Sequence, residues 1–376
     1  MKPQAIFHLD GEPGLRGGER QLLYLAAALH ARGQRSVVYA RSGGELAAEA
    51  ARLGLEVRCL PFLGEWDLVS AASLALAARR EGAIIHAHTA HAAGVGALAA
   101  LGGVPLVAHR RVDFAVSAMS ARLKYGRARR IVSVSKAIAE ILAEAGVPRE
   151  KITVIPDGLP VNKAEGGWVR AEERRFAPAT EDERRRYRGA LAEEFRFPQD
   201  APLIGNLAAL VPHKDHDTLL AAAVIVLLKR PQARFLIAGR GPEQARLFES
   251  IRRMGLLGKV LLLGHIPDPV PLLKAVDIYA QSSWGEGMGS VLIEAAACGT
   301  PIAATRAGGI PEIVEDGMTG LLVAPRHPEA LAEALIRLID DRELAGALAA
   351  QGLKRIQRFG LKRMAEDMEK IYDQLS

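Results

Sequence analysis

The chain has 376 residues and a mass of 40.3 kDa, a length that favours two domains over a single small module. With 49% hydrophobic and 24% charged residues, its composition excludes a disordered chain, a collagen-like repeat and a coiled coil. The formal charge of +6 favours anionic partners such as phosphates or anionic lipids. Two cysteines, Cys59 and Cys298, exclude a disulfide framework or a cysteine-built zinc site and suit a reducing compartment.

The first half of the chain alternates short apolar strands with longer helices rich in Ala, Leu, Glu and Arg. This is the pattern of parallel βαβ units, whose strands are buried on both faces. The strands predicted for this half are Ala5–Leu9, Ser36–Ala40, Val57–Pro61, Ala83–Ala87, Leu106–His109, Ile131–Val134 and Thr153–Ile155.

The alternation stops from Asn162 to Asp200, a segment dense in charge with scattered prolines, which predicts a domain junction. After Asp340 the sequence reads as helix to its end. Between these segments the alternation resumes, with strands predicted at Pro202–Leu207, Arg234–Ala238, Lys259–Leu263, Asp277–Gln281, Ile302–Ala304 and Leu321–Val323.

These patterns predict an α/β protein of two doubly wound, Rossmann-like domains. The first is expected at residues 1–185 and the second at 186–355, with a last helix at 356–376 that is long enough to pack back on the first domain. Because open α/β sheets bind ligands at the carboxyl ends of their strands, we expect the active site in a cleft between the domains.

The strongest local motif is Ser282–Ala295, a glycine-rich loop between a predicted strand and a helix. Glycines let the backbone approach a ligand closely, and the amino end of the helix favours a phosphate. Glu286 and Glu294 offer carboxylates that accept hydrogen bonds from sugar hydroxyls. The alternative reading is a tight turn followed by a solvated helical glutamate.

Glu286 and Glu294 are separated by seven residues and followed by Ala295–Ile302 and Gly308–Val314, which contain Cys298-Gly299-Thr300-Pro301 and Gly308-Gly309-Ile310-Pro311-Glu312. This arrangement closely resembles the family-4 retaining glycosyltransferases, which have the GT-B fold. The resemblance implies an acceptor-side first domain and a second domain that binds a nucleotide diphosphate sugar.

The resemblance also implies roles for individual residues. Glu294 would hold the ribose diol, and Glu286 would contact the donor hexose near the reacting carbon. Lys214 is similar to the family's lysine at the donor diphosphate, but the arginine usual five residues earlier is replaced by Ala209. A second cation therefore comes from elsewhere or is absent. The further residues expected to bind the donor are Gly17, Gly18, His265, Ile266, Gly287, Met288, Gly289 and Ser290.

His109, Arg110 and Arg111 leave a strand of the first domain where relatives carry residues that face the donor sugar and acceptor. Many relatives have a histidine where Arg111 falls, and we include Arg111 among the catalytic residues. Either arginine could contact phosphate through two hydrogen bonds. Exposed loop arginines without a role are an equal alternative.

Histidines gather in the first domain as His86, His88 and His91. They lie without a nearby carboxylate or cysteine ligand in the sequence, so we expect no bound metal. His88 and His109 are candidates for the acceptor side of the cleft. For His88, a buried and hydrogen-bonded structural histidine is the alternative.

Basic residues form a possible partner surface in the first domain, while aromatic residues that would stack on bases are scarce. We therefore expect no nucleic-acid partner. The basic face could rest on anionic lipid, although a solvated helix face is the other reading. Its members are Arg122, Lys124, Arg127, Arg129 and Arg130.

Neither a secretory signal at Met1–Leu9 nor an apolar stretch of the roughly 18 to 20 residues needed to span a bilayer is found in the sequence. We expect a cytoplasmic location, with peripheral contact at the inner face of the membrane as an open possibility.

The resulting expectation is a retaining, metal-independent hexosyltransferase without a cofactor, which uses a nucleotide sugar, UDP-linked in preference to GDP-linked. Its hydroxyl acceptor would belong to a cell-envelope glycoconjugate such as lipopolysaccharide, lipid-linked or soluble. An inverting GT-B transferase, a nucleotide-sugar epimerase and a nonenzymatic sugar-nucleotide-binding protein are the alternatives.

Overall fold

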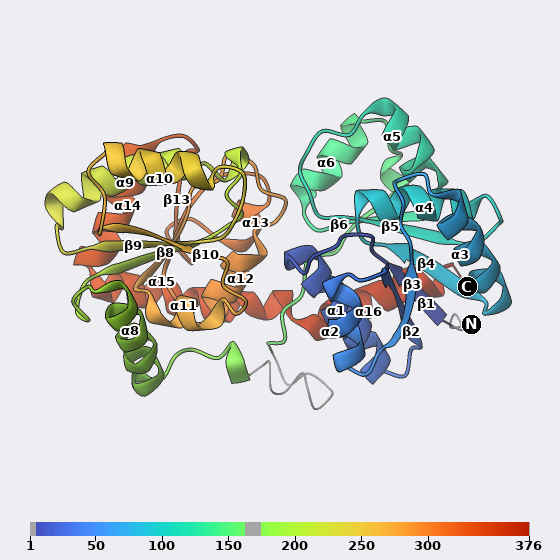
Figure 1. The fold of residues 1–376 in the computed structure, drawn as a ribbon, viewed down its shortest axis with the longest axis horizontal. Coiled ribbons are helices and arrows are strands. Elements are labelled where there is room, and N and C mark those ends of the chain that lie inside the picture. The colour runs from blue at the N-terminus through green and yellow to red at the C-terminus, as the bar shows by residue number, and fades with distance from the viewer. Residues whose placement is uncertain (1–4, 162–173, 376) are drawn as a thin grey trace. The chain divides into compact units, whose positions relative to one another are not determined.

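The computed structural model describes residues 5–161 and 174–375 of the chain (Figure 1). The chain divides into two compact units, one formed by Met1–Glu173 with Phe359–Ser376 and the other by Arg174–Arg358. Each unit contains one parallel sheet with flanking helices. This confirms the predicted α/β class with two Rossmann-like units.

The first unit is built on a seven-stranded sheet with the order β3-β2-β1-β4-β5-β6-β7. All of its strand pairs are parallel. Its central strands are buried along their whole length, as expected for a sheet covered on both faces. The strands are β1 (Ala5–Leu9), β2 (Ser36–Arg41), β3 (Glu56–Leu60), β4 (Ala83–Ala87), β5 (Leu106–Arg110), β6 (Arg130–Ser133) and β7 (Ile152–Val154).

Several helices of the first unit begin at a side chain that accepts hydrogen bonds from the first turn. Asp67, Thr89, Ser117 and Ser135 cap α3, α4, α5 and α6 in this way. The helical elements are α1 (Gly17–Ala31), α2 (Glu45–Arg52), α3 (Leu68–Arg80), α4 (Ala90–Ala100), α5 (Ala118–Leu123), η1 (Tyr125–Arg127), α6 (Lys136–Glu144) and η2 (Arg149–Lys151).

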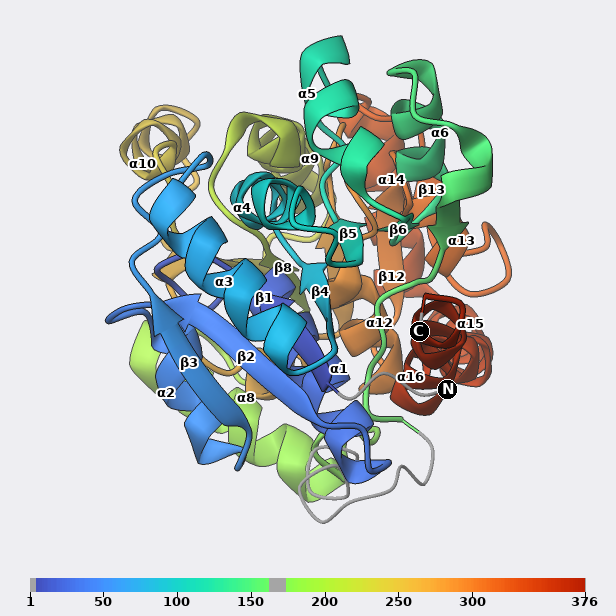
Figure 2. The ribbon, with the colours of Figure 1, turned by 90° about the vertical axis from the view of Figure 1, so that its right-hand side faces the viewer.

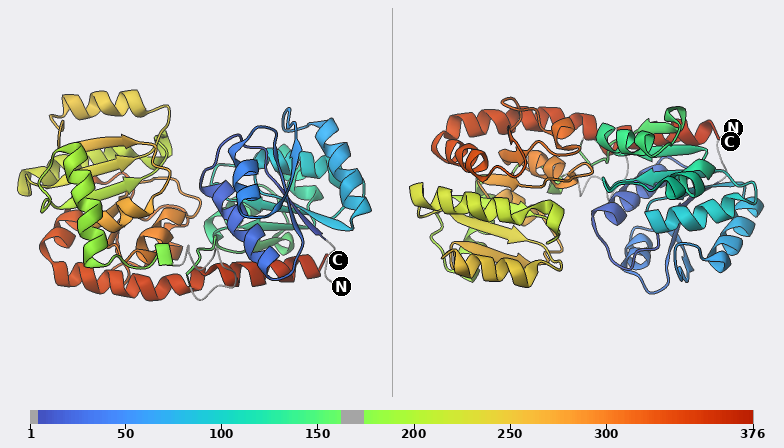
Figure 3. Two further views of the ribbon diagram at one scale, coloured as in Figure 1. Left: turned by 60° about the horizontal axis from the view of Figure 1, so that its bottom comes forward. Right: turned by 90° about the horizontal axis from the view of Figure 1, so that it is seen from above.

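The last helix, α16 (Leu361–Asp373), also belongs to the first unit and follows η4 (Ile356–Phe359). It packs beside α1, where Arg32 forms two hydrogen bonds of 3.1 and 2.8 Å with Glu369 (Figure 3). The backbone of Leu159 bonds with Phe359 and Leu361 at either side of Gly360, with both distances 2.8 Å. The end of the chain is thus an integral part of the first unit.

The second unit contains a six-stranded parallel sheet with the order β10-β9-β8-β11-β12-β13. One apolar core joins its strands to α9 and α14. The strands are β8 (Leu203–Leu207), β9 (Arg234–Ala238), β10 (Val260–Gly264), β11 (Ile278–Gln281), β12 (Ile302–Thr305) and β13 (Leu321–Val323).

The helical elements around this sheet include one that the sequence analysis assigned partly to the first domain. Helix α8 packs on α11, and its Arg184 and Arg188 form ion pairs of 2.6 and 2.9 Å with Asp277. These contacts place the whole helix in the second unit, whereas the sequence put the boundary between residues 185 and 186. The helical elements are α8 (Glu181–Phe195), η3 (Pro212–Lys214), α9 (His216–Lys229), α10 (Gln244–Arg253), α11 (Val270–Ala275), α12 (Ser290–Ala297), α13 (Ile310–Ile313), α14 (Pro328–Asp340) and α15 (Arg342–Arg355).

In both sheets the strand order reverses direction at one place, between β1 and β4 in the first unit and between β8 and β11 in the second. The loops that leave such neighbouring strands diverge and expose the sheet's carboxyl edge, where doubly wound proteins bind ligands. Within the described residues, no helix is both long and apolar enough to cross a bilayer.

Candidate functional site

The loops that follow β8 and β11 are tied together at the carboxyl edge of the second sheet. The carbonyl of His213 accepts hydrogen bonds from the backbone amides of Trp284 and Gly285, at 3.0 and 3.3 Å. The hydroxyl of Ser282 donates to the carbonyl of Lys214 at 3.0 Å. These bonds bring two loops about 70 residues apart in sequence into one surface, consistent with the site's position at the strand-order reversal.

The ammonium group of Lys214 contacts the carboxylate of Glu286, with 2.6 Å between Nζ and Oε2. The same oxygen accepts hydrogen bonds from Nε2 of Gln281 at 3.0 Å and from Oγ of Ser283 at 3.2 Å. Three donors on one oxygen fix the orientation of this buried carboxylate. The structure therefore joins two residues that the sequence analysis singled out separately.

Tyr279 fixes the amide that supports Glu286. Its hydroxyl lies 2.7 Å from Oε1 of Gln281. Burial raises the pKa of Tyr279, and the carboxylates of Glu286 and Glu294 raise it further, so the phenol keeps its proton. Because Oε1 of Gln281 accepts this bond, its Nε2 faces Ser283 and Glu286.

The backbone of Glu286 is held by two glycines that follow β12. The amide of Gly309 donates to the carbonyl of Glu286 at 3.1 Å. Gly308 has φ +47°, and a Cβ atom at this position would lie 1.8 Å from the same carbonyl oxygen. Only glycine allows this approach, which explains the residue at position 308.

We expect Gly308→Ala to destabilise the protein by several kcal/mol, on the order of 3 to 5, because the added methyl group overlaps the Glu286 backbone. Gly317→Ala is the matched control, since Gly317 also has positive φ (+70°) but open space around its Cβ position. That change should cost only about 1 to 2 kcal/mol. Urea unfolding of both variants measures the difference, and equal losses would contradict the proposed overlap.

Glu294 lies in α12, the helix that begins directly after the glycine-rich loop. It is buried, and its charge acts on Tyr279 of β11. Gly289, with φ +85°, stands at the amino end of the helix, and Ser290 is its first residue. Gly287 and Met288 are buried in the loop before it. The predicted donor loop is thus a compact segment around Glu286.

The other residues predicted for the second unit are less closely gathered. His265 and Ile266 follow β10, the edge strand, which β9 and β8 separate from β11. His265 is exposed and Ile266 is partly buried. Ala209 is exposed in the loop after β8, so this loop contributes Lys214 but no arginine.

In the first unit, Arg111 is the centre of a second group. Its Nε lies 3.0 Å from Oδ1 of Asp157, and its Nη1 lies 3.1 Å from Nδ1 of His88. A Cβ atom on Gly18 would be 3.9 Å from Cδ of Arg111, so the glycine pair before α1 lies against this arginine. Gly17 is the first residue of that helix. The structure thus brings Gly18, His88 and Arg111 together.

Arg110 contacts different residues from those that Arg111 contacts. It donates to the hydroxyl of Tyr125 at 3.0 Å and to the carbonyl of Phe114. Both arginines are largely buried and bonded within the first unit, so neither is an exposed loop charge. Arg110 is anchored as a structural residue, whereas Arg111 lies among other predicted site residues.

Four buried histidines form a network beside Arg111. His8 and His88 are joined at 3.1 Å, His86 and His109 at 3.2 Å, and Tyr372 of α16 contacts His86 at 2.7 Å. Burial, together with the nearby Arg111 cation, lowers the pKa of His8 to about 3. Burial also lowers the pKa of His86, His88 and His109 well below the usual range, so all four are neutral.

The structure groups His8, in place of His91, with His86 and His88 as a candidate metal site. His8, His86 and His88 offer nitrogens within 4.8 Å of one another, whereas His91 is exposed and contacts Glu12. Both nitrogens of His86 and of His88 are already engaged in hydrogen bonds, and the Arg111 cation lies against His88. This arrangement fits a neutral hydrogen-bond network better than a cation site.

The predicted basic face is only partly a free surface. Lys124 is buried and forms an ion pair with Glu65, and Arg130 donates to Gln374 at 3.2 Å. Arg122, Arg127 and Arg129 are exposed.

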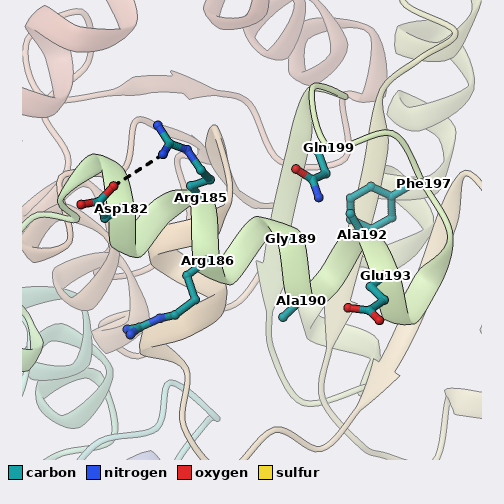
Figure 4. Close-up of a pocket in the computed structure, with 9 residues that line it drawn as sticks. All are labelled: Asp182, Arg185, Arg186, Gly189, Ala190, Ala192, Glu193, Phe197 and Gln199. Carbon is teal, nitrogen blue, oxygen red and sulfur yellow. Dashed lines mark ion pairs between the residues drawn. The ribbon is translucent and has the colours of Figure 1, made fainter.

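A surface hollow of about 770 Å³ lies along α8 in the second unit (Figure 4). None of the predicted site residues lines it. Asp182 and Arg185, in the first turns of α8, form an ion pair of 3.6 Å, drawn as a dashed line in Figure 4. The lining residues are Asp182, Arg185, Arg186, Gly189, Ala190, Ala192, Glu193, Phe197 and Gln199.

Curated relatives resemble parts of the chain. A D-inositol 3-phosphate glycosyltransferase of Corynebacterium jeikeium is 29% identical over 254 residues, which are 65% of this chain and 57% of the relative. A GDP-mannose-dependent monoacylated alpha-(1-6)-phosphatidylinositol monomannoside mannosyltransferase of Corynebacterium glutamicum is 34% identical over 49% of each chain. The lipopolysaccharide core biosynthesis glycosyltransferase LpsE of Rhizobium meliloti is 32% identical over 41% of this chain and 44% of its own. The chain spans about half the length of these relatives.

Solved structures resemble the whole chain. Anabaena Alr3699/HepE, crystallised with UDP and glucose, superposes with a TM-score of 0.84 and 24% identity, over 98% of this chain and 99% of its own. A glycosyltransferase from Rickettsia africae ESF-5 superposes with a TM-score of 0.81 and 20% identity, over 98% of each chain. These likenesses confirm the GT-B fold.

Two sequence families account for most of the chain. The model of Glycosyltransferase Family 4 matches residues 15–163, and that of Glycosyl transferases group 1 matches residues 188–355. Lys214, Glu286 and Glu294 fall within the second match. The chain therefore belongs to the family-4, group-1 glycosyltransferases.

Proposed function

We propose that the protein is a retaining glycosyltransferase that moves a hexose from a nucleotide diphosphate sugar to a hydroxyl group. The observation that carries this proposal is the contact of 2.6 Å between Lys214 and Glu286, at the strand-order reversal of the second sheet. A cation for a diphosphate and a carboxylate for a sugar hydroxyl stand side by side there. Family membership supports the same reaction class.

In this proposal the residues of the second unit hold the donor. Glu294 accepts the two ribose hydroxyls, Glu286 contacts the hexose, and the backbone of Gly287, Met288, Gly289 and Ser290 lies along the donor. Lys214 moves from Glu286 toward the β-phosphate and stabilises the charge that develops on it. His265 and Ile266 would meet the base.

The reaction breaks the bond between the anomeric carbon and the β-phosphate oxygen, while the acceptor oxygen attacks from the same face. The acceptor proton passes to the leaving phosphate, so the step needs no carboxylate nucleophile. Lys214 supplies the charge stabilisation that a metal would otherwise give, and we therefore propose a metal-independent reaction. Arg111, with His88 and His109 beside it, is proposed for the side that faces the acceptor and the donor sugar, and Arg110 serves there as an anchor.

A UDP-linked donor is favoured over a GDP-linked one because the HepE structures contain UDP, UDP with glucose, and UDP-glucose. One mannosyltransferase relative is GDP-mannose-dependent, so GDP-mannose is the second donor to test.

The relatives named for lipopolysaccharide core and phosphatidylinositol mannoside synthesis support an acceptor in a cell-envelope glycoconjugate. The two free cysteines suit a cytoplasmic site of action.

The proposal is tested by incubating the protein with a panel of UDP- and GDP-sugars and candidate acceptors, with and without EDTA. We expect transfer from a UDP-hexose, a product with the donor's anomeric configuration by NMR, and no loss of rate with EDTA. A product of opposite configuration would identify an inverting enzyme, and a changed nucleotide sugar without transfer would identify an epimerase. Donor binding without any turnover would identify a sugar-nucleotide-binding protein.

Glu294→Ala should weaken donor binding about 10- to 100-fold, because it removes charged hydrogen bonds worth about 1.5 to 3 kcal/mol. The turnover number should fall much less. Glu333→Ala, at an exposed position of α14, is the matched control and should bind the donor normally. Isothermal titration with UDP measures both, and equal affinities for the two variants would remove Glu294 from the donor site.

A further inference from the structure

Helix α3 lies on the outside of the first unit (Figure 2). Several of its apolar side chains are exposed to solvent. Leu68, Val69 and Leu76 are 69%, 66% and 52% exposed. At 100° per residue they share one arc of the helix with Ala72, which is also exposed. The opposite side of the helix packs into the unit through Ala71, Leu74 and Ala78, so α3 is apolar on both sides.

Neighbouring segments extend this surface at both ends of the helix. Leu63 and Trp66, in the loop before α3, are 79% and 46% exposed. Leu101, at the end of α4, is exposed next to Gly102, where a Cβ atom would lie 3.3 Å from Cζ of Arg79. Isolated exposed apolar residues are ordinary, but a contiguous group of them marks an interaction surface. The α3 face is defined by Leu63, Trp66, Leu68, Val69, Leu76 and Leu101.

The charges around the α3 face leave it net positive. Glu65 is paired with Lys124, and Glu81 is paired with Arg58 at 2.5 Å and with Arg35. Asp67 is buried as the cap of α3, where its carboxylate accepts from the amides of Val69 and Ser70. The carboxylates of Glu65 and Glu81 are therefore already paired with cations of the unit, and that of Asp67 is buried at the start of the helix.

Arg79 and Arg80 lie in the last turn of α3, and both are exposed. Among residues 5–161 and 174–375, neither forms an ion pair with a carboxylate. Their guanidinium groups are available to anions at the edge of the apolar surface. A helix with an exposed apolar arc and basic residues beside it is the kind that lies in a membrane interface.

We propose that the α3 face docks the protein on the surface of an anionic membrane. The apolar side chains would enter the boundary between headgroups and acyl chains, Trp66 would lie at headgroup level, and Arg79 and Arg80 would contact lipid phosphates. A second copy of the chain fits less well, because a symmetric contact would bring no unpaired carboxylate to these arginines. This surface differs from the predicted basic face, in which Lys124 and Arg130 already form contacts within the first unit.

The proposal is independent of the sugar-transfer reaction, since docking requires neither donor nor acceptor. It is tested by sedimentation of the full chain with phosphatidylcholine vesicles that contain or lack phosphatidylglycerol. We expect binding to the anionic vesicles, a loss of at least about tenfold in affinity for the double variant Leu68→Glu/Leu76→Glu, and a similar loss for Arg79→Gln/Arg80→Gln.

Leu228→Glu is the matched control, because Leu228 is 81% exposed on α9 of the second unit and should tolerate the charge without losing vesicle binding. Circular dichroism checks that each variant is folded. Absence of binding to anionic vesicles would overturn the proposal, as would equal binding by Leu68→Glu/Leu76→Glu and the parent chain. A dimer in light scattering that this double variant abolishes would instead assign the face to a second copy.

Discussion

Replacing Lys214 with alanine should lower the turnover number by about 10²- to 10³-fold, because the developing charge on the leaving phosphate loses its cation. In the free protein the change also removes the contact of 2.6 Å with Glu286. The carboxylate keeps its bonds from Gln281 and Ser283, so it should stay in place. The effect should therefore fall on turnover more than on donor affinity.

Steady-state kinetics with the donor identified by the panel measures this effect, and titration with UDP separates binding from turnover. Lys214→Arg should restore part of the rate, since it restores a cation. Lys229→Ala is the matched control, because Lys229 is exposed at the end of α9, the helix that follows Lys214 in the chain. A Lys214→Ala variant with an unchanged turnover number would exclude the lysine from the reaction.

Acid should unfold the first unit cooperatively, because its four buried histidines are neutral when folded and take up protons when unfolded. Burial holds the pKa of each below the ordinary value near 6.5, so stability is fully present above that pH and is lost as the pH falls. Asp10 acts in the opposite direction: burial raises its pKa to about 7, and unfolding releases its proton. Burial raises the pKa of Asp157 as well.

On unfolding, the four histidines gain four protons, and Asp10 and Asp157 release at most two. The net uptake is therefore two or more. The free energy of unfolding should therefore fall by about 3 kcal/mol per pH unit below about pH 6. Urea unfolding at a series of pH values, followed by circular dichroism and by hydrogen exchange of the β4 and β5 amides, measures this slope. His109→Gln should reduce it by about 1.4 kcal/mol per pH unit, whereas the exposed His91→Gln should not change it. A stability independent of pH between about 7 and 5.5 would contradict the neutral network.

The strands could be predicted almost residue by residue. Each predicted strand is present with ends shifted by no more than one residue, because short aliphatic runs buried on both faces contrast sharply with the helices between them. The order of the strands within each sheet is harder to predict from the sequence, because it depends on the edge of the sheet to which each crossover connection leads. The boundary near residue 185 was misplaced because the charge of α8 reads as a linker, although Arg184 and Arg188 are bound to Asp277.

The sequence motifs identified Lys214 and Glu286 as candidate site residues, but they did not identify the side chains that hold Glu286 in place. Lys214 and Glu286 stand in recognisable loops, but Gln281 and Ser283 look like ordinary polar residues at the end of a strand. Their role depends on the side-chain geometry around Glu286, which no spacing rule encodes.

The first unit gives a similar lesson. His8 and Asp157 are isolated in sequence, far from His88 and Arg111, and only the sheet brings them together. The register of β1 with β4 places His8 opposite His86, a pairing that the alternation of side chains allows but does not specify. The burial of Lys124 was missed for the same reason, because its partner Glu65 lies in a loop far away in the sequence.

A crystal structure of the protein with its nucleotide sugar tests the proposed donor site most directly. We predict the diphosphate within hydrogen-bond distance of Nζ of Lys214, the ribose hydroxyls on the carboxylate of Glu294, and the hexose beside Glu286. A donor bound elsewhere on the chain, or bound with both Lys214 and Glu294 turned away from it, would contradict the assignment.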